Sequence, residues 1–557
     1  MRTQRTSSWL LTSLLSFVVV VLLLPAVRGQ APRDTPLVDA ARHDDLQAVR
    51  ALIARRANVN EHARDGSTAI LWAAANSNLE MARALIAAGA AVNTPNHYGI
   101  TPLLQASRSG DAPLVAALLK AGADHAAGHP DGETPLMAAS RSGRVEAVRL
   151  LLEAGSNVNA AEAYQHQTAL MWAAGEGHVD VVKALLAAGA NPNQKARVNA
   201  INERKHADHP TGGFTALMFA ARNGHGEIAR ALVEGGADPN LTNGDGATAT
   251  IVAIVNDRFD LARQLLDLGA DANDGSLYFA VDMHDATIDM RARDGSRLRA
   301  NHPNKLTALD LVTLLLDRGA DPNKPFVGQL HSTSYCCGDD VNSSAFYRAA
   351  IASDVEVLKL MIARGARIEW SPSEVKKEGA AAGRGANANV GRTPIVVAMA
   401  GGRGAPLAGG PGFDRIGPPP FREPSSRDPL EALEVLLAAG ASPNVKAPDG
   451  STPLHQAVQA RQVAMIRTLV AAGASLNATN KDNLTPLQLA EKPEPPGPAT
   501  PVDPGVFRPK RDTREEVIAA LRELMKLGPN DPTPVPPPAP AEPGKEKEAE
   551  NKKGDQK

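Results

Sequence analysis

A repeat period of about 33 residues constrains the fold of this chain more than any other feature. Gly-Ala or Gly-Ser pairs close successive apolar stretches, and most of these pairs recur at this spacing. A few longer intervals, of which Gly365 to Gly440 is the longest, indicate repeats that carry insertions. Self-similarity of this length is typical of a solenoid, in which each repeat packs only on its neighbours. The closing pairs begin at Gly89, Gly122, Gly155, Gly189, Gly236, Gly269, Gly319, Gly365, Gly440 and Gly473.

Residues 131–155 show the local signals of one repeat. An Asp-Gly pair at the start favours a turn. Thr134 is placed to cap a helix, and Pro135 stands at the first helical position, where no N–H donor is needed. Apolar residues three and four positions apart then predict a second helix, which Gly155 ends in a left-handed conformation. Each repeat is therefore expected to be a turn followed by two helices.

Several motifs of these repeats resemble those of the ankyrin-repeat family. The family's Thr-Pro-Leu-His start is matched at Thr101, Thr134, Thr393, Thr452 and Thr485, and more weakly at Thr68, Thr168 and Thr215. Its mid-repeat Gly-His recurs at Gly177 and Gly224, and its closing motif at Gly89, Gly236 and Gly473. The resemblance covers residues 30–527 as about twelve repeats, with atypical repeats at the ends. It implies an all-α repeat solenoid of stacked helix–turn–helix repeats with short β-turn or hairpin tips.

Residues 1–29 have the parts of a secretory signal peptide. Arg2 and Arg5 precede an apolar run from Leu10 to Leu24, which is shorter than the roughly 20 residues that a membrane span requires. The small residues Val27 and Gly29 stand three and one positions before the expected cleavage site, so we expect cleavage after Gly29. We therefore expect residues 1–29 to direct export, and the mature protein to be periplasmic or secreted. An uncleaved membrane anchor is the alternative.

Six segments interrupt the period at connections within or between repeats. Such insertions are tolerated because the connections of a solenoid lie at its surface. The chain ends in residues 528–557, where a Pro-rich stretch followed by alternating Lys and Glu is typical of a disordered tail. The interrupting segments are 194–212, 286–306, 324–343, 370–390, 401–428 and 492–512.

The sequence contains no complete catalytic or metal-binding motif. The mature region has no nucleophile elbow, no His-Glu-x-x-His helix motif and no phosphate-binding loop. With 59 basic and 61 acidic residues, the chain also lacks the basic excess of nucleic-acid binders. We therefore expect no enzyme activity, cofactor or metal, and no nucleic-acid or small-molecule ligand. The two cysteines, Cys336 and Cys337, are adjacent, and a strained disulfide between them and free or intermolecular thiols remain alternatives.

Arginines recur at one position of the first helix, directly after its pair of small residues. Equivalent positions of successive repeats stack along one face of a solenoid, so Arg42, Arg108, Arg141 and Arg222 predict an interrupted basic row. The resemblance places this row toward the concave surface, close to the turn tips that usually contact partners. The tip residues predicted to bind a partner with it are His62, Arg64, His97, Tyr98, His129, Tyr164 and His166.

An alternative explanation of the basic row is structural. Arginine favours helices, its long stem covers apolar surface, and neighbouring acids neutralise its charge. Trp72, Trp172 and Phe219 also recur in register, at a position where the family usually has a core Leu. Packing between repeats is the favoured role for these three aromatic residues.

These features together predict a non-catalytic protein–protein interaction scaffold of the bacterial envelope, which binds a protein partner through the concave face and turn tips. The bacterial source is inferred from the junction of a signal peptide with an array rich in Ala and Arg. A rigid, preformed surface loses little entropy on binding. Two alternatives remain: a secreted effector acting on another cell, and a metal-binding or catalytic protein built on the long insertions. Membrane contact is expected only if the signal peptide is retained.

Overall fold

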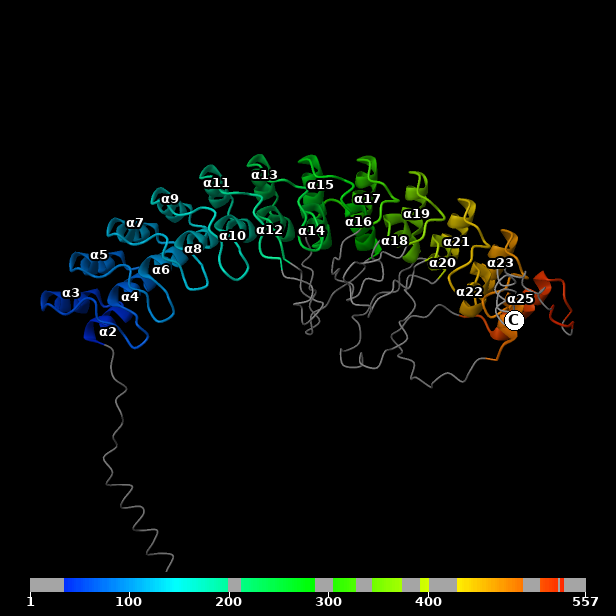
Figure 1. Ribbon diagram of the computed structural model, residues 1–557, viewed down its shortest axis with the longest axis horizontal. Helices are drawn as coiled ribbons and strands as arrows, with labels where there is room; N and C mark the ends of the chain where they lie inside the picture. The colour runs from blue at the N-terminus through cyan, green and yellow to red at the C-terminus, as the bar shows by residue number, and fades with distance from the viewer. Residues whose placement is uncertain are drawn as a thin grey trace, which may run out of the picture. The chain divides into compact units, whose positions relative to one another are not determined.

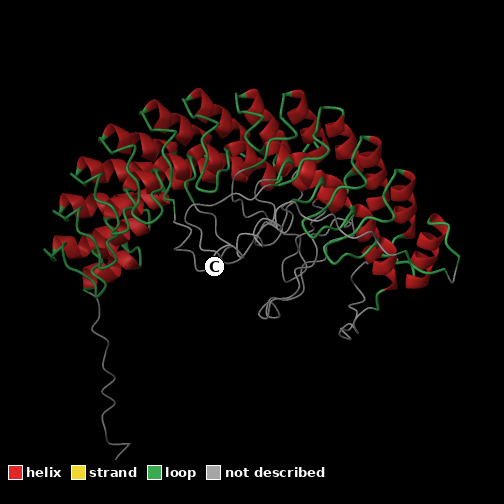
Figure 2. Ribbon diagram, turned by 45° about the vertical axis from the view of Figure 1, so that its right-hand side comes forward, coloured by secondary structure: helices red, strands yellow, loops and turns green. Residues whose placement is uncertain are grey.

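The computed structural model describes residues 35–198, 212–285, 304–326, 343–372, 391–399, 428–493, 511–528 and 531–534. Within these ranges the regular elements are α-helices that follow one another in pairs (Figure 1, Figure 2), and β-structure is limited to four isolated bridges. The predicted signal peptide 1–29, the cysteine pair 336–337, most of the six interrupting segments and most of the predicted tail lie outside the described residues.

The chain divides into two compact units between Asn191 and Pro192. Unit 1 contains five helix pairs among its described residues, and unit 2 contains seven. The pairs of unit 1 are α2 (Pro36–Arg42) with α3 (Leu46–Ala54), α4 (Ala69–Ala75) with α5 (Leu79–Ala87), α6 (Pro102–Ser109) with α7 (Ala112–Lys120), α8 (Pro135–Ser142) with α9 (Val145–Glu153), and α10 (Ala169–Glu176) with α11 (Val179–Ala187).

Unit 2 continues the same order of a first and a second helix. Its pairs are α12 (Ala216–Asn223) with α13 (Gly226–Glu234), α14 (Ala249–Val255) with α15 (Phe259–Asp267), α16 (Ser276–Asp285) with α17 (Ala308–Asp317), α18 (Ala345–Ile351) with α19 (Val355–Ile362), α20 (Pro394–Ala398) with α21 (Pro429–Ala438), α22 (Pro453–Ala460) with α23 (Val463–Ala471), and α24 (Pro486–Glu491) with α25 (Arg514–Leu524).

Capping residues set the ends of the helices, as the sequence predicts. Thr134 Oγ1 accepts from the backbone N of Met137 at 3.3 Å, and Pro135 is the first residue of α8. Gly155, which follows α9, has φ +92°, a left-handed conformation that side chains disfavour. The first and last pairs instead end at Arg56 and Lys526, with φ of +59° and +58°.

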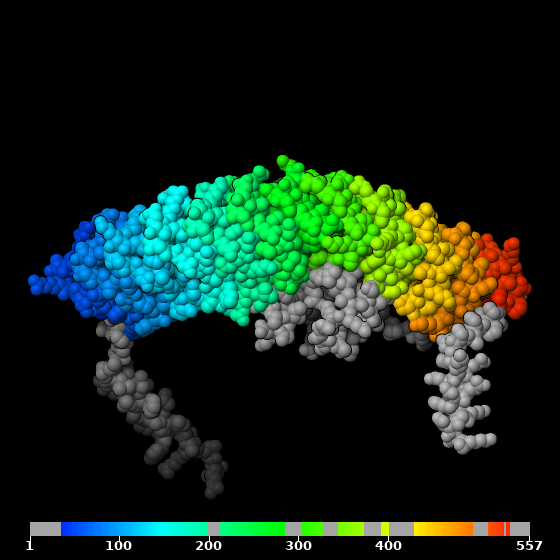
Figure 3. Space-filling view, turned by 45° about the horizontal axis from the view of Figure 1, so that its top comes forward, coloured from blue at the N-terminus to red at the C-terminus, as the bar shows by residue number. Residues whose placement is uncertain are grey.

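The core consists of two rows of helices within each unit. First helices pack on the first helices of neighbouring pairs, and second helices pack in a row of their own (Figure 1). In the space-filling view of Figure 3, successive stretches of the described chain lie next to one another within each unit in the order of their colours. Leu103 and Leu104 of α6, and Leu114 and Leu118 of α7, are fully buried between neighbouring pairs. Burial of one such side chain contributes about 1.5–3 kcal/mol, so the stability of a pair depends on its neighbours.

An asparagine four residues after most closing glycines joins its loop to the next repeat. Asn93 Nδ2 donates to the carbonyl oxygen of Gly122 at 2.9 Å, and Asn93 Oδ1 accepts from the backbone N of Asp124 at 2.8 Å. Both ends of the amide are thus satisfied, which fixes the spacing of consecutive repeats. This asparagine clamp also forms at Asn60, Asn159, Asn193, Asn240, Asn273, Asn323 and Asn444.

Two junctions have another residue at the clamp position. Ala126 has no polar side chain to reach Gly155. Glu369 retains half of the contact, because its Oε1 accepts from the backbone N of Ser442 at 2.6 Å. The junction at Ala126 therefore lacks a connection that most others possess.

The turn tips of unit 1 are joined by backbone hydrogen bonds. The carbonyl oxygen of Asp65 accepts from His97 N at 2.8 Å, and that of Asp131 accepts from Ala163 N at 2.7 Å. Pro130 stands at the equivalent position of the tip between them and has no N–H to donate. Hydrogen bonds of this kind hold neighbouring tips in a defined row.

Two of the interrupting segments, 194–212 and 324–343, have an isolated β-bridge at or next to their described ends. Val198 pairs with Gly212, and Pro325 pairs with Ser344, each as an isolated antiparallel bridge. The Pro325–Ser344 bridge is equivalent to the one that joins His62 to Thr68 in a tip without an insertion. The described stem of segment 324–343 therefore keeps the geometry of an ordinary tip on both sides of the inserted residues.

Candidate functional site

Two arginines of the predicted basic row lie over aromatic rings of the following repeat. Arg42 Cζ is 5.1 Å from the centre of the Trp72 ring, and Arg141 Cζ is 5.0 Å from that of Trp172. Both tryptophans are half-buried. A cation over an aromatic face at this distance is attracted by the ring quadrupole, so these arginines connect repeats within unit 1.

The other two arginines of the row also have partners. Arg108, which is half-buried, forms an ion pair with Glu133 in the next turn tip. In unit 2, Arg222 Cζ lies 5.2 Å from the ring centre of Phe219 in the same helix. All four arginines thus contribute to contacts of the array, while Arg141 and Arg222 also keep exposed surface.

The predicted tip residues of unit 1 differ in how much surface they offer. Tyr98 is 64% exposed and Tyr164 is 72% exposed, and they are two of the three exposed large hydrophobic residues of the described chain. His129 Nδ1 lies 2.7 Å from a carboxylate oxygen of Asp131 and is half-buried. The remaining predicted tip residues, all exposed, are His62, Arg64, His97 and His166.

Acidic groups in these tips stabilise the turns themselves. Burial opposes ionisation of Asp65, but hydrogen bonds from Ser67 N and Oγ, both 2.9 Å, outweigh it and lower the pKa of the Asp65 carboxyl. The buried carboxylate of Glu162 accepts from the backbone N of Tyr164 at 2.6 Å and of Gln167 at 2.9 Å. The tip that carries Tyr164 is therefore fixed by its own acid.

Unit 2 contains an ion pair and a His–Asp hydrogen bond that the repeat pattern does not predict. The Nη2 atom of Arg348, on α18, lies 2.7 Å from Oδ1 of Asp282, on α16, and the Arg348 side chain is only 6% exposed. His284 Nδ1, also on α16, lies 2.7 Å from Asp354 Oδ2, which is buried before α19. Because these residues are separated by 66 and 70 positions, only the stacking of the repeats brings them together. They link neighbouring pairs of unit 2.

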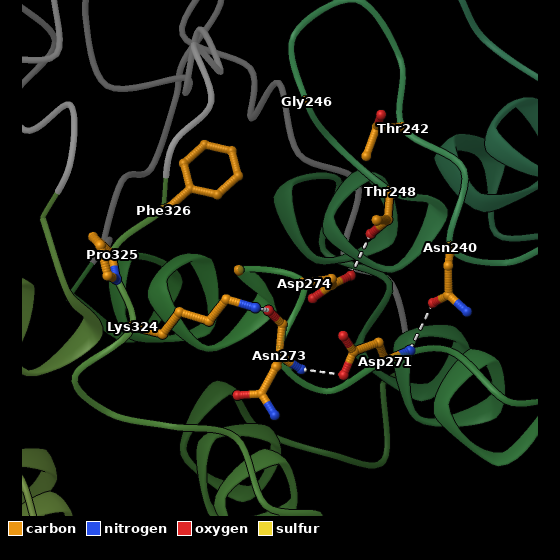
Figure 4. A pocket seen from close by; sticks show the side chains of 11 residues that line it. Asn240, Thr242, Gly246, Thr248, Asp271, Asn273, Asp274, Lys324, Pro325 and Phe326 are labelled. Atoms are coloured by element: carbon orange, nitrogen blue, oxygen red, sulfur yellow. Dashed lines mark hydrogen bonds between the residues drawn. The ribbon is translucent and has the colours of Figure 1, made fainter. Parts of the chain in front are cut away.

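A pocket of about 340 Å³ lies in unit 2 among the loops that precede α14, α16 and α18 (Figure 4). The middle loop is short, because seven residues lead from Gly269 to Ser276 where thirteen lead from Gly236 to Ala249. The missing six residues are those that form the turn tip in the preceding loop. We call the space the turn-deletion pocket, and it is lined by residues from 240–248, 271–275 and 324–326.

The sequence does carry a signal for this pocket. The interval from Gly269 to Gly319 exceeds one period, which indicates an insertion, and it contains the predicted segment 286–306. That insertion conceals the six-residue deletion earlier in the same interval. The deletion shows when the number of residues from each closing glycine to the next helix start is compared between repeats. The distance between successive glycines does not reveal it.

The described residues lack a metal-binding cluster and a membrane-spanning helix. No group of three or more His, Cys, Asp or Glu side chains is arranged to hold a metal ion there. No helix within those same ranges has the length and apolar character needed to cross a membrane.

The paired helices, the left-handed closing glycines and the turn tips define an all-α repeat solenoid. Family models described as "Ankyrin repeats (3 copies)" match residues 37–129, 103–196 and 198–276, and one described as "Ankyrin repeats (many copies)" matches residues 427–490. The chain belongs to the ankyrin-repeat family. Ankyrin repeats generally mediate protein–protein interaction, and the fold is typically a non-catalytic scaffold.

Among solved structures, the crystal structure of the human ASB11 ankyrin repeat domain is similar to this chain. It is 30% identical in sequence, with a TM-score of 0.36, and the match covers 42% of this chain and 97% of that chain. The comparison with curated proteins found no match.

Proposed function

We propose that this chain is a non-catalytic scaffold that binds a protein partner through the turn tips and first-helix face of unit 1. The observation that carries the proposal is the exposure of Tyr98 and Tyr164, 64% and 72%, on tips of the same unit. Tyrosine is enriched in binding hot spots because it offers a large apolar ring and a polar end at a small cost in conformational entropy. Large apolar groups are otherwise mostly covered in the described chain.

The tips that carry the tyrosines are ordered before a partner arrives. The tip bearing Tyr98 is tied to its neighbour by the hydrogen bond from His97 N to Asp65 O, at 2.8 Å. The tip bearing Tyr164 is closed by Glu162 and tied to Asp131 through Ala163 N. Pre-ordered loops lose little entropy on association, so more of the contact energy becomes affinity. His97, next to Tyr98 in its tip, and Arg141 on α8 are exposed and supply hydrogen-bond donors in the same unit.

The proposal also includes a location for the scaffold. Residues 1–29 would export the chain, and the partner would be a protein of the bacterial envelope. The charged and apolar run of residues 2–24 supports this part of the proposal. Separate periplasmic and medium fractions of the native host test it, since retention in the periplasm agrees with a scaffold and release into the medium with a secreted effector.

The binding face is tested with the mature chain from Gln30 as bait. A double variant, Tyr98→Ser with Tyr164→Ser, removes both rings from exposed positions and leaves the tip backbone intact. The matched control is Glu146→Ser with Arg149→Ser, an exposed ion pair on the second helix α9. Hot-spot tyrosines contribute about 2 kcal/mol or more each, which corresponds to roughly 30-fold in affinity per ring, so the double variant should bind the captured partner roughly 700-fold more weakly when the two contributions add.

The outcomes of this experiment separate clearly. Loss of binding in the tyrosine variant, with unchanged binding in the α9 control, supports the face. Equal affinity of the tyrosine variant and the parent chain, measured by titration calorimetry, would remove Tyr98 and Tyr164 from the proposal and with them its main support.

A further inference from the structure

Two carboxylates line the turn-deletion pocket, that of the exposed Asp271 and that of the half-buried Asp274. Asp271 Oδ1 accepts from the backbone N of Asn273 at 2.9 Å. Asp274 Oδ1 accepts from the backbone N of Ser276 at 2.8 Å, and its Oδ2 accepts from Thr248 Oγ1. Figure 4 shows both aspartates on the loop between Asn240 and Lys324, with Phe326 across the pocket. Both acids are therefore held in place by hydrogen bonds to neutral groups.

No cation of the described chain neutralises these two acids. Lys324 is the lysine among the lining residues, and its ammonium donates to the carbonyl oxygen of Asn273 at 2.6 Å. Burial raises the pKa of the Asp274 carboxyl above its ordinary value, despite the hydrogen bonds it accepts. A partly buried carboxylate without a counter-charge is stabilised by any cation that enters the pocket.

An aromatic ring forms the opposite wall. The Phe326 ring lies 4.8 Å from that of Phe279, edge to face, and 6.4 Å from that of Tyr278. It also covers Gly275, where an added Cβ would come within 2.4 Å of the ring. The ring is thus fixed in position. Its surface suits both the aliphatic stem and the charged head of a lysine or arginine side chain.

The geometry points to recognition of a basic side chain: we propose that the turn-deletion pocket binds a lysine or arginine carried on a loop of a protein partner. Charge complementarity selects the class of side chain, since two acids and one ring line a space with a single, already bonded ammonium. The absent turn favours a loop as the binding partner, because the six residues that form the turn tip of the preceding loop are missing here. The site lies in unit 2 and does not depend on Tyr98 or Tyr164.

The binding test uses blocked tripeptides with the full mature chain. Ac-Gly-Lys-Gly-NH2 and Ac-Gly-Arg-Gly-NH2 are the probes, and Ac-Gly-Gln-Gly-NH2 and Ac-Gly-Glu-Gly-NH2 are the uncharged and acidic comparisons. Saturation-transfer NMR detects the weak binding expected for a single side chain, and a titration gives its Kd. Both basic peptides should bind, with the acidic peptide showing no saturable signal.

Matched variants locate the binding. Asp271→Asn and Asp274→Asn remove a charge but keep an acceptor for the turn, and each should weaken the basic peptides about tenfold. The control is Asp238→Asn, because Asp238 does not line the pocket but accepts the same turn hydrogen bond, from Asn240 N at 2.9 Å. A second type of variant inserts the sequence of residues 241–246 between Asn273 and Asp274, which restores the missing turn and should abolish binding while circular dichroism stays unchanged.

Each result decides the matter. Binding of basic peptides that is lost in the pocket variants and retained in Asp238→Asn supports the inference. Absence of saturable binding to the parent chain, equal binding of the glutamate peptide, or undiminished binding after the turn is restored would overturn it. None of these results depends on capture through the tyrosine face, so the two proposals can fail separately.

Discussion

The guanidinium of Arg141 lies over the ring of Trp172, with 5.0 Å between Cζ and the ring centre. One residue belongs to α8 and the other to α10, so the contact crosses a junction between repeats. Arg42 and Trp72 repeat the relationship at 5.1 Å. A position that sequence analysis associates with partner binding therefore also holds the array together, and variants there must be judged by stability as well as by affinity.

Replacing Arg141 by Ala should destabilise unit 1 by about 0.5–1 kcal/mol, because an exposed cation–π contact has that strength. Urea unfolding followed by tryptophan fluorescence measures the change close to Trp172. The control is Arg149→Ala, which removes an exposed arginine paired only with Glu146 in the same helix. A midpoint for Arg141→Ala equal to that of the control would contradict the stabilising role of this contact.

Introducing asparagine at position 126 should add the clamp that its junction lacks. The new amide would lie opposite the carbonyl oxygen of Gly155 and the backbone N of Asn157, as Asn93 lies opposite Gly122 and Asp124. One to two hydrogen bonds contribute roughly 0.5–1.5 kcal/mol each, so Ala126→Asn should raise the melting temperature. Asn93→Ala should lower it. If Ala126→Asn melts no higher than the parent chain, the clamp does not limit stability there.

Glycine at position 56 should stabilise the first repeat. Arg56 has φ +59°, and a side chain in the left-handed region costs about 1 kcal/mol, partly offset by the greater freedom of glycine in the unfolded chain. The converse change, Gly89→Ala, should destabilise although space is free around its Cβ position, because φ is +88°. Differential scanning calorimetry of both variants checks the prediction, and shifts in the same direction would refute it.

His455 should make the C-terminal repeats of unit 2 sensitive to acid. Burial lowers the pKa of this fully buried histidine below 6.5. Its Nδ1 lies 2.9 Å from Thr452 Oγ1 and its Nε2 lies 2.9 Å from Leu484 O. Because the folded-state pKa is depressed, the stabilisation is present above pH 6.5 and is lost as the pH falls through the folded-state value.

Thermal melting between pH 7.5 and about 4.5 measures this loss. His455→Gln, which keeps one donor and one acceptor but cannot gain a proton, should flatten the decline in melting temperature on the acid side. The exposed residue His97 provides the matched control, His97→Gln. A pH profile of His455→Gln that parallels the parent profile throughout would show that His455 does not carry the effect.

Local signals in the sequence predict the helix pairs well. Thr134, Pro135 and Gly155 each act through residues within one or two turns, so their roles follow from the sequence alone. The recurrence of Trp72 and Trp172 was likewise visible. The sequence also predicts their arginine partners as a row, but which ring each arginine covers depends on the separation of stacked repeats.

Other features depend on contacts that no local pattern encodes. Arg348 and Asp282 meet only because α16 and α18 are neighbours in unit 2. The turn-deletion pocket depends on a shortened loop whose effect on the period is masked by a longer stretch of chain before α17. The distance from Gly269 to Gly319 includes both the deletion before α16 and the insertion before α17. The longer insertion therefore hides the deletion.

The bridge between Pro325 and Ser344 closes a stem of the same form as the bridge between His62 and Thr68 in an uninterrupted tip. The residues between the two sides of such a stem can change in length without altering the register of the helices on either side. An evolving chain can therefore acquire new sequence in one tip at a time. The tips can diversify in this way while the packing of the helix pairs stays the same.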